Sequence, residues 1–584
     1  MSNRYNGILV SSGSATVRGT WHRDLPFVIE GDLTIETGVV LTLEPGVVVK
    51  LTTAYSYYRC NIIVNGGLVA NGTTTDRIIF TSIHDDGAGG DTNNNGSQSW
   101  PGPGDWKGIQ FTASSLSSSS VAYANIAYGG CQYSYYGGCS EFPMMKITGA
   151  SPTIANNLVA YSGWYGIQIE SLAAPTIRDN IIRDNRNHGL VLANRAAPTV
   201  QNNQFIANQG YAVYMDAGCT PVFTGNTATN NRTNGIGVSG TAGTSTTWKA
   251  NLTYVVEGMT IDSGVTLTLE PGVIVKFGPY ASLTANGNLI AVGTSESKII
   301  FTSLKDDTVG GDTNNDGNAS APAAGNWYYM QFTSSSTGSR LEWIEIRYGG
   351  YYYCDGCTMY PELLLDGVAM QISNAVVSDS SGYGIQVKNT SPTFTNVEIR
   401  NTRYGAYLEN AHPTIRNSTI HDNVACGVCG TGSNPTITGS TISNSNWGAS
   451  LSSTSAPYPN ISGNTFANNR GGAASIETPA LSTFGLNTFV GTVGNGVWVG
   501  SGTLTANATL YGSGVYVLGD VVVEQGATLT VRAGAVVKLR YHSYYYCPYP
   551  YYGPCGASLL IHGVLSADGA VDQKIVFTTE RDDA

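Results

Sequence analysis

The chain has 584 residues, of which 72 are glycine, 41% are apolar and only 12% are charged. This composition excludes a disordered polymer and a helix-rich protein, and it favours many short strands joined by tight turns. The net charge of −11, with 29 basic against 40 acidic residues and no basic cluster, argues against nucleic acid or an anionic membrane as a partner. Cations and neutral sugars remain as expected partners.

The N-terminal segment, residues 1–26, is predicted to be a cap or strand segment. It begins MSNRYNGILVSSGS and shows neither a charged region followed by an apolar core nor a cleavage site. No stretch of the chain approaches the ~18 apolar residues of a membrane span, so we expect no membrane insertion. Because the cysteine pairs described next favour an extracellular protein, we expect that an export signal was trimmed from the start of the sequence.

The ten cysteines indicate the compartment. Eight of them form local pairs in the sequence, and Cys60 and Cys219 are left over. Close pairs inside Gly/Tyr-rich loops favour disulfides and an oxidising setting, so we expect an extracellular or bacterial cell-surface protein. The candidate disulfide pairs are Cys131 and Cys139, Cys354 and Cys357, Cys426 and Cys429, and Cys547 and Cys555.

A period of 23 residues runs through the first part of the chain. The residues that recur with this spacing are Pro152, Pro175, Pro198 and Pro221; Asn157, Asn180, Asn203 and Asn226; and Ser162, Asn185, Asn208 and Asn231. Apolar positions alternate in the same register. This period is too short for a helix pair and suits one coil of three short strands. Stacking coils at ~4.8 Å would align the asparagines so that they hydrogen-bond to their counterparts above and below.

These PT-I-x-x-N and N-x-x-x-G-I coils resemble the right-handed parallel β-helix repeats of the pectate-lyase-like superfamily, including bacterial secreted and surface β-helix proteins. The resemblance covers most of the chain. It implies an all-β fold, a right-handed parallel β-helix solenoid of ~21–24 residues per coil with loop insertions. It says little about function, because many unrelated secreted proteins share this solenoid.

A longer repeat groups the coils into units. The matching segments are VVLTLEPGVVVKL (39–51), VTLTLEPGVIVKF (265–277) and ATLTVRAGAVVKL (527–539), followed by RIIFTSIHDD (77–86), KIIFTSLKDD (298–307) and KIVFTTERDD (574–583). We therefore predict unit boundaries at 27–246, 247–508 and 509–584, the last one incomplete. The third unit stops before its own Asp/Asn loop, which predicts either a truncated chain or completion by another molecule.

Asp/Asn/Gly insertions, at 85–105 and 306–326, mark the first two units. In DTNNDG the spacing of Asp312, Asn314, Asp316 and the following glycine resembles the start of an EF-hand-type calcium loop, although the closing Glu of that pattern is replaced by Ala323. Asp306 and Asp307 could supply the closing carboxylates. The alternative is a turn without metal, since these residues are common turn formers. Clustered carboxylates favour calcium.

The first insertion offers a similar but weaker set of ligands. It contains Asp85, Asp86, Asp91, Asn93 and Asn95, and Asn95 stands where the second insertion has Asp316. Because calcium affinity follows the number of charged ligands, the first site is expected to bind more weakly.

Tyrosine-rich loops interrupt the coils at 52–60, 129–143, 349–361 and 541–555. Their rings could form a binding or assembly surface for glycans or another subunit, or they could merely cover the outside of the solenoid. The candidate surface residues are Tyr57, Tyr58, Tyr135, Tyr136, Tyr352, Tyr353, Tyr545, Tyr546, Tyr551 and Tyr552. The CxxC pairs Cys354/Cys357 and Cys426/Cys429 could instead be half zinc sites, but no histidine stands at ligand spacing beside them.

An enzyme is the main functional alternative, because carbohydrate lyases and hydrolases share the fold. Asp179, Arg183, Asp184 and His188 could serve as acid, base and orienting groups. The 23-residue repeat weakens this hypothesis, since the positions equivalent to His188 and Asp184 in the other coils lie on the outside and hold residues of varied type. We therefore assign no catalytic residue. The sequence favours a calcium-stabilised structural or adhesive rod, or a filament that forms through the solenoid ends, with a glycan-binding protein as a further alternative.

Overall fold

The computed structural model describes residues 4–52, 60–131, 141–352, 358–453, 455–491, 496–542 and 555–582. Within them the chain is almost entirely β-structure, apart from the 3-10 helix η1 (Thr478–Thr483). No helix in these ranges is both long and apolar enough to cross a membrane.

The chain packs as two compact units. Unit 1 contains Met1–Thr260, Val265–Lys276 and Leu304–Ala321, and unit 2 contains Ile261–Gly264, Phe277–Ser303 and Pro322–Ala584. These units are defined by packing, whereas the predicted boundaries at 246 and 508 follow sequence repeats. The two divisions do not coincide.

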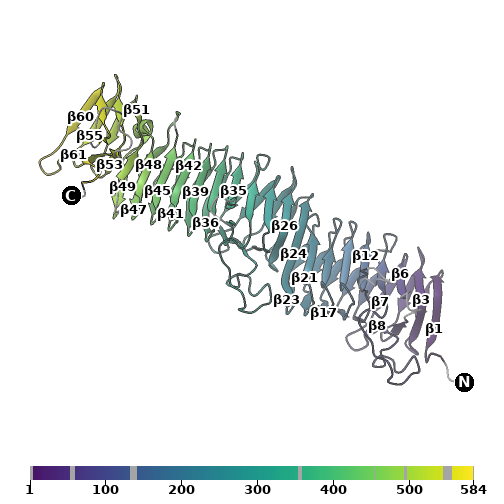
Figure 1. Cartoon of the computed structure of the whole chain (residues 1–584). Coiled ribbons are helices and arrows are strands. Elements are labelled where there is room, and N and C mark those ends of the chain that lie inside the picture. Colours follow the sequence, from purple (N-terminus) through teal and green to yellow (C-terminus); the bar gives the residue numbers. More distant parts are fainter. Residues whose placement is uncertain are drawn as a thin grey trace. The chain divides into compact units, whose positions relative to one another are not determined.

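Unit 1 consists of coils that each contribute one strand to three parallel ladders (Figure 1). The first ladder is β2 (Gly19–Trp21), β4 (Val40–Leu43), β7 (Gly67–Asn71), β10 (Ser120–Ala122), β13 (Thr153–Ala155), β16 (Thr176–Arg178), β19 (Thr199–Gln201) and β22 (Val222–Thr224). The second contains β8 (Ile78–Ser82), β11 (Ala124–Ala127), β14 (Leu158–Ala160), β17 (Ile181–Arg183), β20 (Gln204–Ile206) and β23 (Thr227–Thr229). The third contains β6 (Asn61–Val64), β9 (Gly108–Phe111), β12 (Met145–Thr148), β15 (Ile167–Glu170), β18 (Leu190–Leu192), β21 (Tyr211–Asp216) and β24 (Thr233–Ala242).

The core of unit 1 is a set of aliphatic and aromatic rows that run from coil to coil. Strand register places Ile154, Ile177, Val200 and Phe223 above one another, each at most 2% exposed. Because side chains alternate between the two faces of a strand, the residues between them point outward. The predicted solenoid of three short strands per coil is confirmed, and its interior is filled by side chains.

Two asparagine ladders close the turns between the strands. In the first, the backbone N–H and the side-chain amide of Asn180 both donate to Oδ1 of Asn203, at 3.0 and 2.9 Å, and Asn203 donates in the same way to Asn226. The second runs from Asn185 through Asn208 to Asn231. These side chains are at most 5% exposed, so the hydrogen bonds predicted from the 23-residue period are present.

The residue before each ladder asparagine has a left-handed backbone. The φ angle is 57° at Asn156 and Asp179, 54° at Asn202, and 52° at Asp184. Asn and Asp adopt this conformation more readily than other non-glycine residues because their short polar side chains bond locally. The Asp and Asn pairs in the repeat are therefore explained by turn geometry.

Unit 2 repeats the architecture. Its longest ladder contains β29 (Ser282–Ala285), β32 (Tyr329–Phe332), β35 (Pro361–Asp366), β37 (Tyr383–Lys388), β39 (Tyr404–Glu409), β42 (Cys426–Thr431), β45 (Trp447–Ser452), β48 (Gly472–Ile476), β50 (Gly496–Val499), β53 (Val515–Leu518), β56 (Val536–Leu539) and β61 (Val576–Thr579). A second ladder includes β31 (Ile299–Ser303), β34 (Ile344–Arg347), β36 (Gln371–Ser378), β38 (Thr393–Arg400), β41 (Thr419–His421), β44 (Thr441–Ser443), β47 (Thr465–Ala467) and β49 (Thr488–Val490). Beyond η1, β51 (Gly502–Leu504), β54 (Val521–Val523) and β59 (Leu559–Ile561) form one short sheet, and β52 (Ala508–Leu510), β55 (Thr528–Arg532) and β60 (Val564–Asp568) form another.

Replacement of a ladder asparagine tests the turn mechanism. We expect Asn203→Ala to lower the free energy of unfolding by about 2–4 kcal/mol, because it leaves buried donors and acceptors of the neighbouring coils without partners. The measurement is chemical denaturation followed by circular dichroism. The matched control is Asn202→Gly, since the exposed Asn202 lies in a left-handed turn that glycine also accepts. Equal losses of stability in the two variants would contradict the ladder mechanism.

Candidate metal centre

Both Asp/Asn loops leave a coil at the same place. β8 and β31 carry the same IIFTS sequence, and an aspartate pair follows each strand after a short turn. The two strands have five residues each and the same burial pattern. The aspartates of both insertions therefore follow equivalent strands of the sequence repeat. Residues 304–321, which include the acidic part of the second insertion, belong to unit 1 by their packing.

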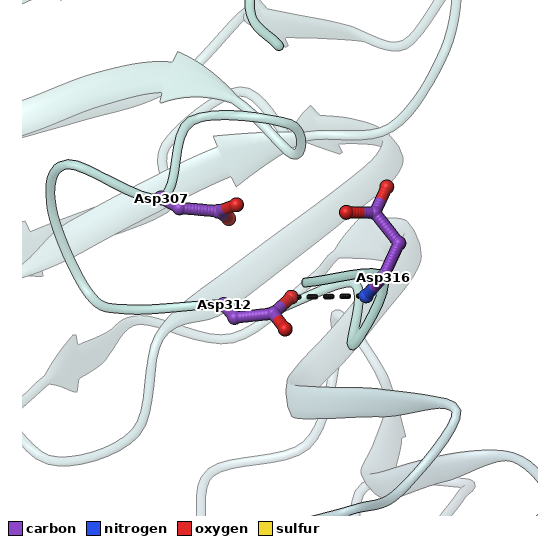
Figure 2. A group of neighbouring side chains, drawn as sticks. All are labelled: Asp307, Asp312 and Asp316. Atoms are coloured by element: carbon purple, nitrogen blue, oxygen red, sulfur yellow. Dashed lines mark hydrogen bonds between the residues drawn. The ribbon is translucent and has the colours of Figure 1, made fainter. Parts of the chain in front are cut away.

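Three carboxylates of the second loop converge. One oxygen from each of Asp307, Asp312 and Asp316 lies within 4.8 Å of the others. Figure 2 shows Asp307 and Asp316 on either side of Asp312, whose Oδ1 accepts the backbone N–H of Asp316 at 3.1 Å. The other oxygen of Asp312 accepts the N–H of Gly317 at 2.9 Å. Asp312 therefore fixes the turn that brings Asp316 to the group.

The oxygens that would face a cation have no hydrogen-bond donor. They are Asp307 Oδ1, Asn314 Oδ1 and Asp316 Oδ1 in the second loop, and Asp86 Oδ1, Asn93 Oδ1 and Asn95 Oδ1 in the first. The two sets occupy equivalent positions of the repeat. Leaving a buried acceptor without a partner is costly, and calcium prefers carboxylate and amide oxygens as ligands. The donor set present in each loop therefore fits a hard divalent cation.

The first aspartate of each pair has a different role. Oδ1 of the fully buried Asp306 accepts hydrogen bonds from the backbone N–H and the hydroxyl of Thr308, at 3.2 and 2.6 Å. Asp85 likewise accepts from Thr81 and from the N–H of Gly87. Asp306 and Asp85 thus stabilise the turns at which the loops begin. The group of three convergent carboxylates does not include Asp306.

Sequence reasoning missed the groups that dock these loops. The buried Lys50 donates to the carbonyl of Gly90 at 2.7 Å, and the buried Lys276 donates to the carbonyl of Gly311 at 2.8 Å. The signal was present, since both lysines end the repeated LEPGVxVK motif. The sequence does not show that these lysines reach the carbonyls of the loops, because that contact depends on how the coils stack.

An asparagine docks each loop from a second direction. The side chain of Asn6 donates to the carbonyl of Asp91 at 3.0 Å, and that of Asn234 donates to the carbonyl of Asp312 at 3.2 Å. The backbone N–H groups of the same two asparagines bind Thr92 and Thr313. Both asparagines belong to a repeated NGI sequence. Together with the lysines they hold each loop through its backbone carbonyls, without using the side-chain oxygens of the loop.

Electrostatics favour a positive charge at the second loop. Burial, and then the neighbouring Asp312, raise the pKa of Asp307, with smaller contributions from Asp316 and Asp306 in the same direction and from Lys276 in the opposite one. The lysine therefore offsets only part of the repulsion. A divalent cation would offset the rest.

The predicted disulfides are resolved at one place. The Sγ atoms of Cys426 and Cys429 on β42 lie at disulfide distance, with their Cα atoms 6.1 Å apart. Cys60 and Cys219 are buried free thiols, and burial raises the pKa of Cys219 to about 11. The other pairings stay predictions, because Cys139, Cys354, Cys357, Cys547 and the side chain of Cys555 lie outside the described residues.

The predicted tyrosine surface also lies largely outside the described residues. This holds for Tyr57, Tyr58, Tyr135, Tyr136, Tyr353, Tyr545, Tyr546, Tyr551 and Tyr552. Tyr352 is described, and the guanidinium of Arg403 lies 4.7 Å from its ring centre. Whether these loops form one surface therefore stays a prediction.

The residues considered for catalysis do not form a common site. Arg178 pairs with Asp179 and Arg183 pairs with Asp184, in left-handed turns before the asparagine ladders. His188 packs between Tyr165 and Tyr214, with ring centres 5.3 and 5.0 Å away, and its Nδ1 accepts the N–H of Tyr211. Burial lowers the pKa of His188 to about 4, so the ring is neutral at pH 7.

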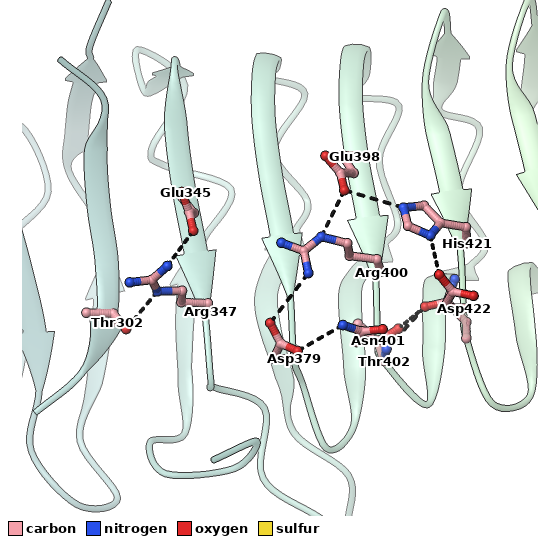
Figure 3. Close-up of polar contacts among 11 residues, drawn as sticks. Thr302, Glu345, Arg347, Asp379, Glu398, Arg400, Asn401, Thr402, His421 and Asp422 are labelled. Carbon is pink, nitrogen blue, oxygen red and sulfur yellow. Dashed lines mark hydrogen bonds and ion pairs between the residues drawn. The ribbon is translucent and has the colours of Figure 1, made fainter. Parts of the chain in front are cut away.

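A charged network on the second ladder of unit 2 was not foreseen (Figure 3). Glu398 accepts from Arg400 at 2.8 Å and faces His421 Nε2 at 3.3 Å, while Asp422 contacts the other ring nitrogen at 2.5 Å. Arg400 also reaches Asp379, at 3.9 Å. Two of these contacts, Arg400 with Asp379 and Glu398 with His421, join neighbouring coils, so the network links adjacent strands of the ladder.

Unit 2 also buries one carboxyl group completely. Oε1 of Glu362 accepts the N–H of Gly349 at 2.8 Å, whereas Oε2 has no partner. Burial raises the pKa of Glu362 well above its usual range. The corresponding PMMKI segment of unit 1 places Met144 at this position, where PELLL has Glu362.

These observations define the class of protein: a parallel β-helix repeat protein with loop insertions. The family model of the right-handed beta helix region matches residues 108–251 and 363–513, together just over half of the chain. The chain belongs to this right-handed β-helix family. No curated protein and no solved structure matches the chain.

The buried carboxyl of Glu362 predicts a pH-dependent stability. Because its folded pKa lies above the unfolded value of about 4.3, stability is greatest below that value and falls as the pH rises towards the folded pKa. We expect Glu362→Met to remove this fall and to increase the free energy of unfolding at pH 7 by about 1–3 kcal/mol. The measurement is denaturation between pH 4 and pH 8, with the exposed Glu296→Met as control. A less stable Met variant at pH 7 would contradict this account.

Proposed function

We propose that this protein is a non-enzymatic extracellular β-helix scaffold, stabilised by calcium, with a structural or adhesive role at a bacterial surface or appendage. The observation that carries the proposal is the repeated set of donor-free oxygens in the two Asp/Asn loops. One such loop could be an accident of turn geometry. Two loops with the same orphaned positions point to a common ligand.

The loops need such a ligand because coil stacking does not hold them. A coil strand forms backbone hydrogen bonds to its neighbours and buries every second side chain, whereas the loop from Gly310 to Gly317 is attached by Lys276 and Asn234 and leaves its acidic side chains clustered. Calcium would supply the missing attraction. Since it would bind only the folded loop, it would stabilise the fold by mass action.

A charge swap between the two loops tests the calcium proposal. We expect Asp316→Asn to weaken the second site about tenfold and Asn95→Asp to strengthen the first by a similar factor, because one charged ligand is exchanged in each case. Isothermal titration of the full chain with calcium measures both affinities. Saturating calcium should stabilise the wild-type fold by about 2–4 kcal/mol in thermal unfolding.

Two controls separate calcium binding from general charge effects. Asp262→Asn removes an exposed carboxylate outside the loops and should leave both affinities unchanged. Magnesium at the same concentration should bind more weakly, since it demands a smaller octahedral set of ligands. A wild-type chain whose unfolding temperature does not respond to calcium would refute the proposal.

The proposed assembly is end to end, between copies of the chain. In unit 2, Leu565 and Phe577 are 38% and 47% exposed, whereas the equivalent Leu68 and Phe80 of unit 1 are each 1% exposed beneath further coils. Among the described residues, β59, β60 and β61 each pair with a strand on one side. Such apolar edges pair readily with another chain. A following coil of the same chain or β1 (Ile8–Ala15) of a second copy would cover them, and we propose the second copy.

The assembly is tested by sedimentation velocity over a range of protein concentrations. Wild-type protein should form larger species as the concentration rises, and Leu565→Lys with Phe577→Lys should keep it monomeric, since buried lysines would oppose the contact. Leu172→Lys changes a 71% exposed residue between β15 and β16, away from the proposed contact, and serves as the control. A wild-type chain that stays monomeric at every concentration would contradict end-to-end assembly.

A further inference from the structure

The first Asp/Asn loop contains an asparagine that is followed directly by a glycine, Asn95 and Gly96. Asparagine is among the thermolabile residues, because the next backbone nitrogen can attack its side-chain carbonyl carbon. Glycine leaves that approach open, since it has no side chain, and Gly96 is exposed with a φ of 64°. The equivalent pair in the second loop is Asp316 and Gly317. The first loop therefore carries an amide where the second carries a carboxylate.

One carboxylate holds both backbone N–H groups of this pair. Oδ1 of Asp91 accepts the N–H of Asn95 at 3.1 Å, and Oδ2 accepts the N–H of Gly96 at 2.8 Å. The nitrogen of Gly96 must lose its proton before it can act as a nucleophile. A carboxylate at hydrogen-bond distance is placed to accept that proton, so Asp91 lies where the attack needs a general base.

The side-chain amide of Asn95 is bonded at its nitrogen only. Nδ2 donates to the hydroxyl of Ser99 at 2.9 Å, whereas the buried Oδ1 has no donor. The hydroxyl of Ser99 also faces Nδ1 of His84 at 3.0 Å. The nitrogen that would leave as ammonia therefore already lies beside a hydroxyl that can relay a proton to it.

The second loop shows that a carboxylate fits this position. Ser320, at the position of Ser99, donates to Oδ2 of Asp316 at 2.5 Å. The amide of Asn314 donates to the same oxygen at 2.8 Å. Asp312 holds the turn through the same two backbone N–H groups. A carboxylate at residue 95 would therefore find a hydroxyl and an amide donor already in place.

Asn–Gly pairs in the turns of the coils are held differently. The N–H groups of Gly66 and Gly287, which follow Asn65 and Asn286, each donate to a carbonyl of a neighbouring coil at 3.0 Å. Both glycines are buried. Attack by these nitrogens would break a backbone hydrogen bond between coils, so we expect the amides of Asn65 and Asn286 to persist.

We propose that Asn95 converts to aspartate without an enzyme, and that the first loop thereby acquires the ligand set of the second. The nitrogen of Gly96 forms a bond to Cγ of Asn95, the bond from Cγ to Nδ2 breaks, and ammonia leaves with the proton that Gly96 gives up. Water then adds to Cγ of the cyclic imide and breaks its bond to the nitrogen of Gly96, which recovers a proton. The net change consumes water and releases ammonia. The expected gain in calcium affinity rests on the proposed function, whereas the conversion itself does not.

The test follows the freshly purified full chain during incubation in mildly alkaline buffer with a calcium chelator. Peptide mapping by mass spectrometry measures the exchange of amide for acid at each asparagine, and a protease specific for aspartate distinguishes aspartate from isoaspartate. We expect residue 95 to convert at least about tenfold faster than Asn65 and Asn286, because its attacking nitrogen is not held by the backbone of a neighbouring coil.

Calcium titration before and after the incubation measures the consequence. The first site of the incubated chain should bind calcium about tenfold more tightly than that of the fresh chain, and it should match the Asn95→Asp variant. Asn95→Gln keeps the amide but needs a larger ring, so its mass and its calcium affinity should not change during incubation. Asp91→Asn removes the charge of the proposed base and should slow the conversion of Asn95.

The outcomes separate this inference from the calcium proposal. A wild-type chain that is stabilised by calcium but keeps the amide of Asn95 would overturn this inference alone. Conversion of Asn95 in a chain whose unfolding temperature does not respond to calcium would support the conversion and refute the calcium proposal. Isoaspartate as the main product, or a first site that binds calcium more weakly after incubation, would overturn the acquired ligand set.

Discussion

Every other feature of this protein depends on parallel stacking of coils in register. Each strand hydrogen-bonds to the equivalent strand of the next coil, so like residues are brought above like residues. Stacking alone would leave the turn backbones buried without partners. The asparagine ladders solve this, because Oδ1 of Asn203 accepts both the backbone and the side-chain N–H of Asn180. A shift of one residue would turn every apolar side chain outward and break the ladders together.

Stacking also explains how one fold carries separate tasks on separate surfaces. Inward rows such as Ile154 and Ile177 supply cohesion. Turn positions such as Asp179 and Asp184 adopt a left-handed backbone, and their carboxylates pair with Arg178 and Arg183. The long Asp/Asn loops follow the ends of strands β8 and β31. Outward positions carry tyrosines such as Tyr383 and Tyr404.

The loops and the buried carboxyl of Glu362 show how far the repeats have diverged. Asn95 and Asp316 occupy equivalent positions, and so do Met144 and Glu362. In each case the backbone is retained while the chemistry differs by one functional group. At these positions the repeats supply their own matched controls, since Asp316→Asn, Asn95→Asp and Glu362→Met each introduce the residue that the other copy carries.

The sequence by itself determined the coil period, the parallel solenoid and the asparagine ladders, because those depend on residues that recur at a fixed spacing. It also located the two acidic loops. Only the tertiary structure decided that Asp307, Asp312 and Asp316 converge while Asp306 braces the turn, and that Lys50 and Lys276 dock the loops. It likewise aligned Tyr383, Tyr404 and Trp447, which stand in coils that differ in length by one residue. Periodicity specifies which coils repeat, whereas contacts made by irregular insertions and by coils of unequal length depend on how the coils stack in space.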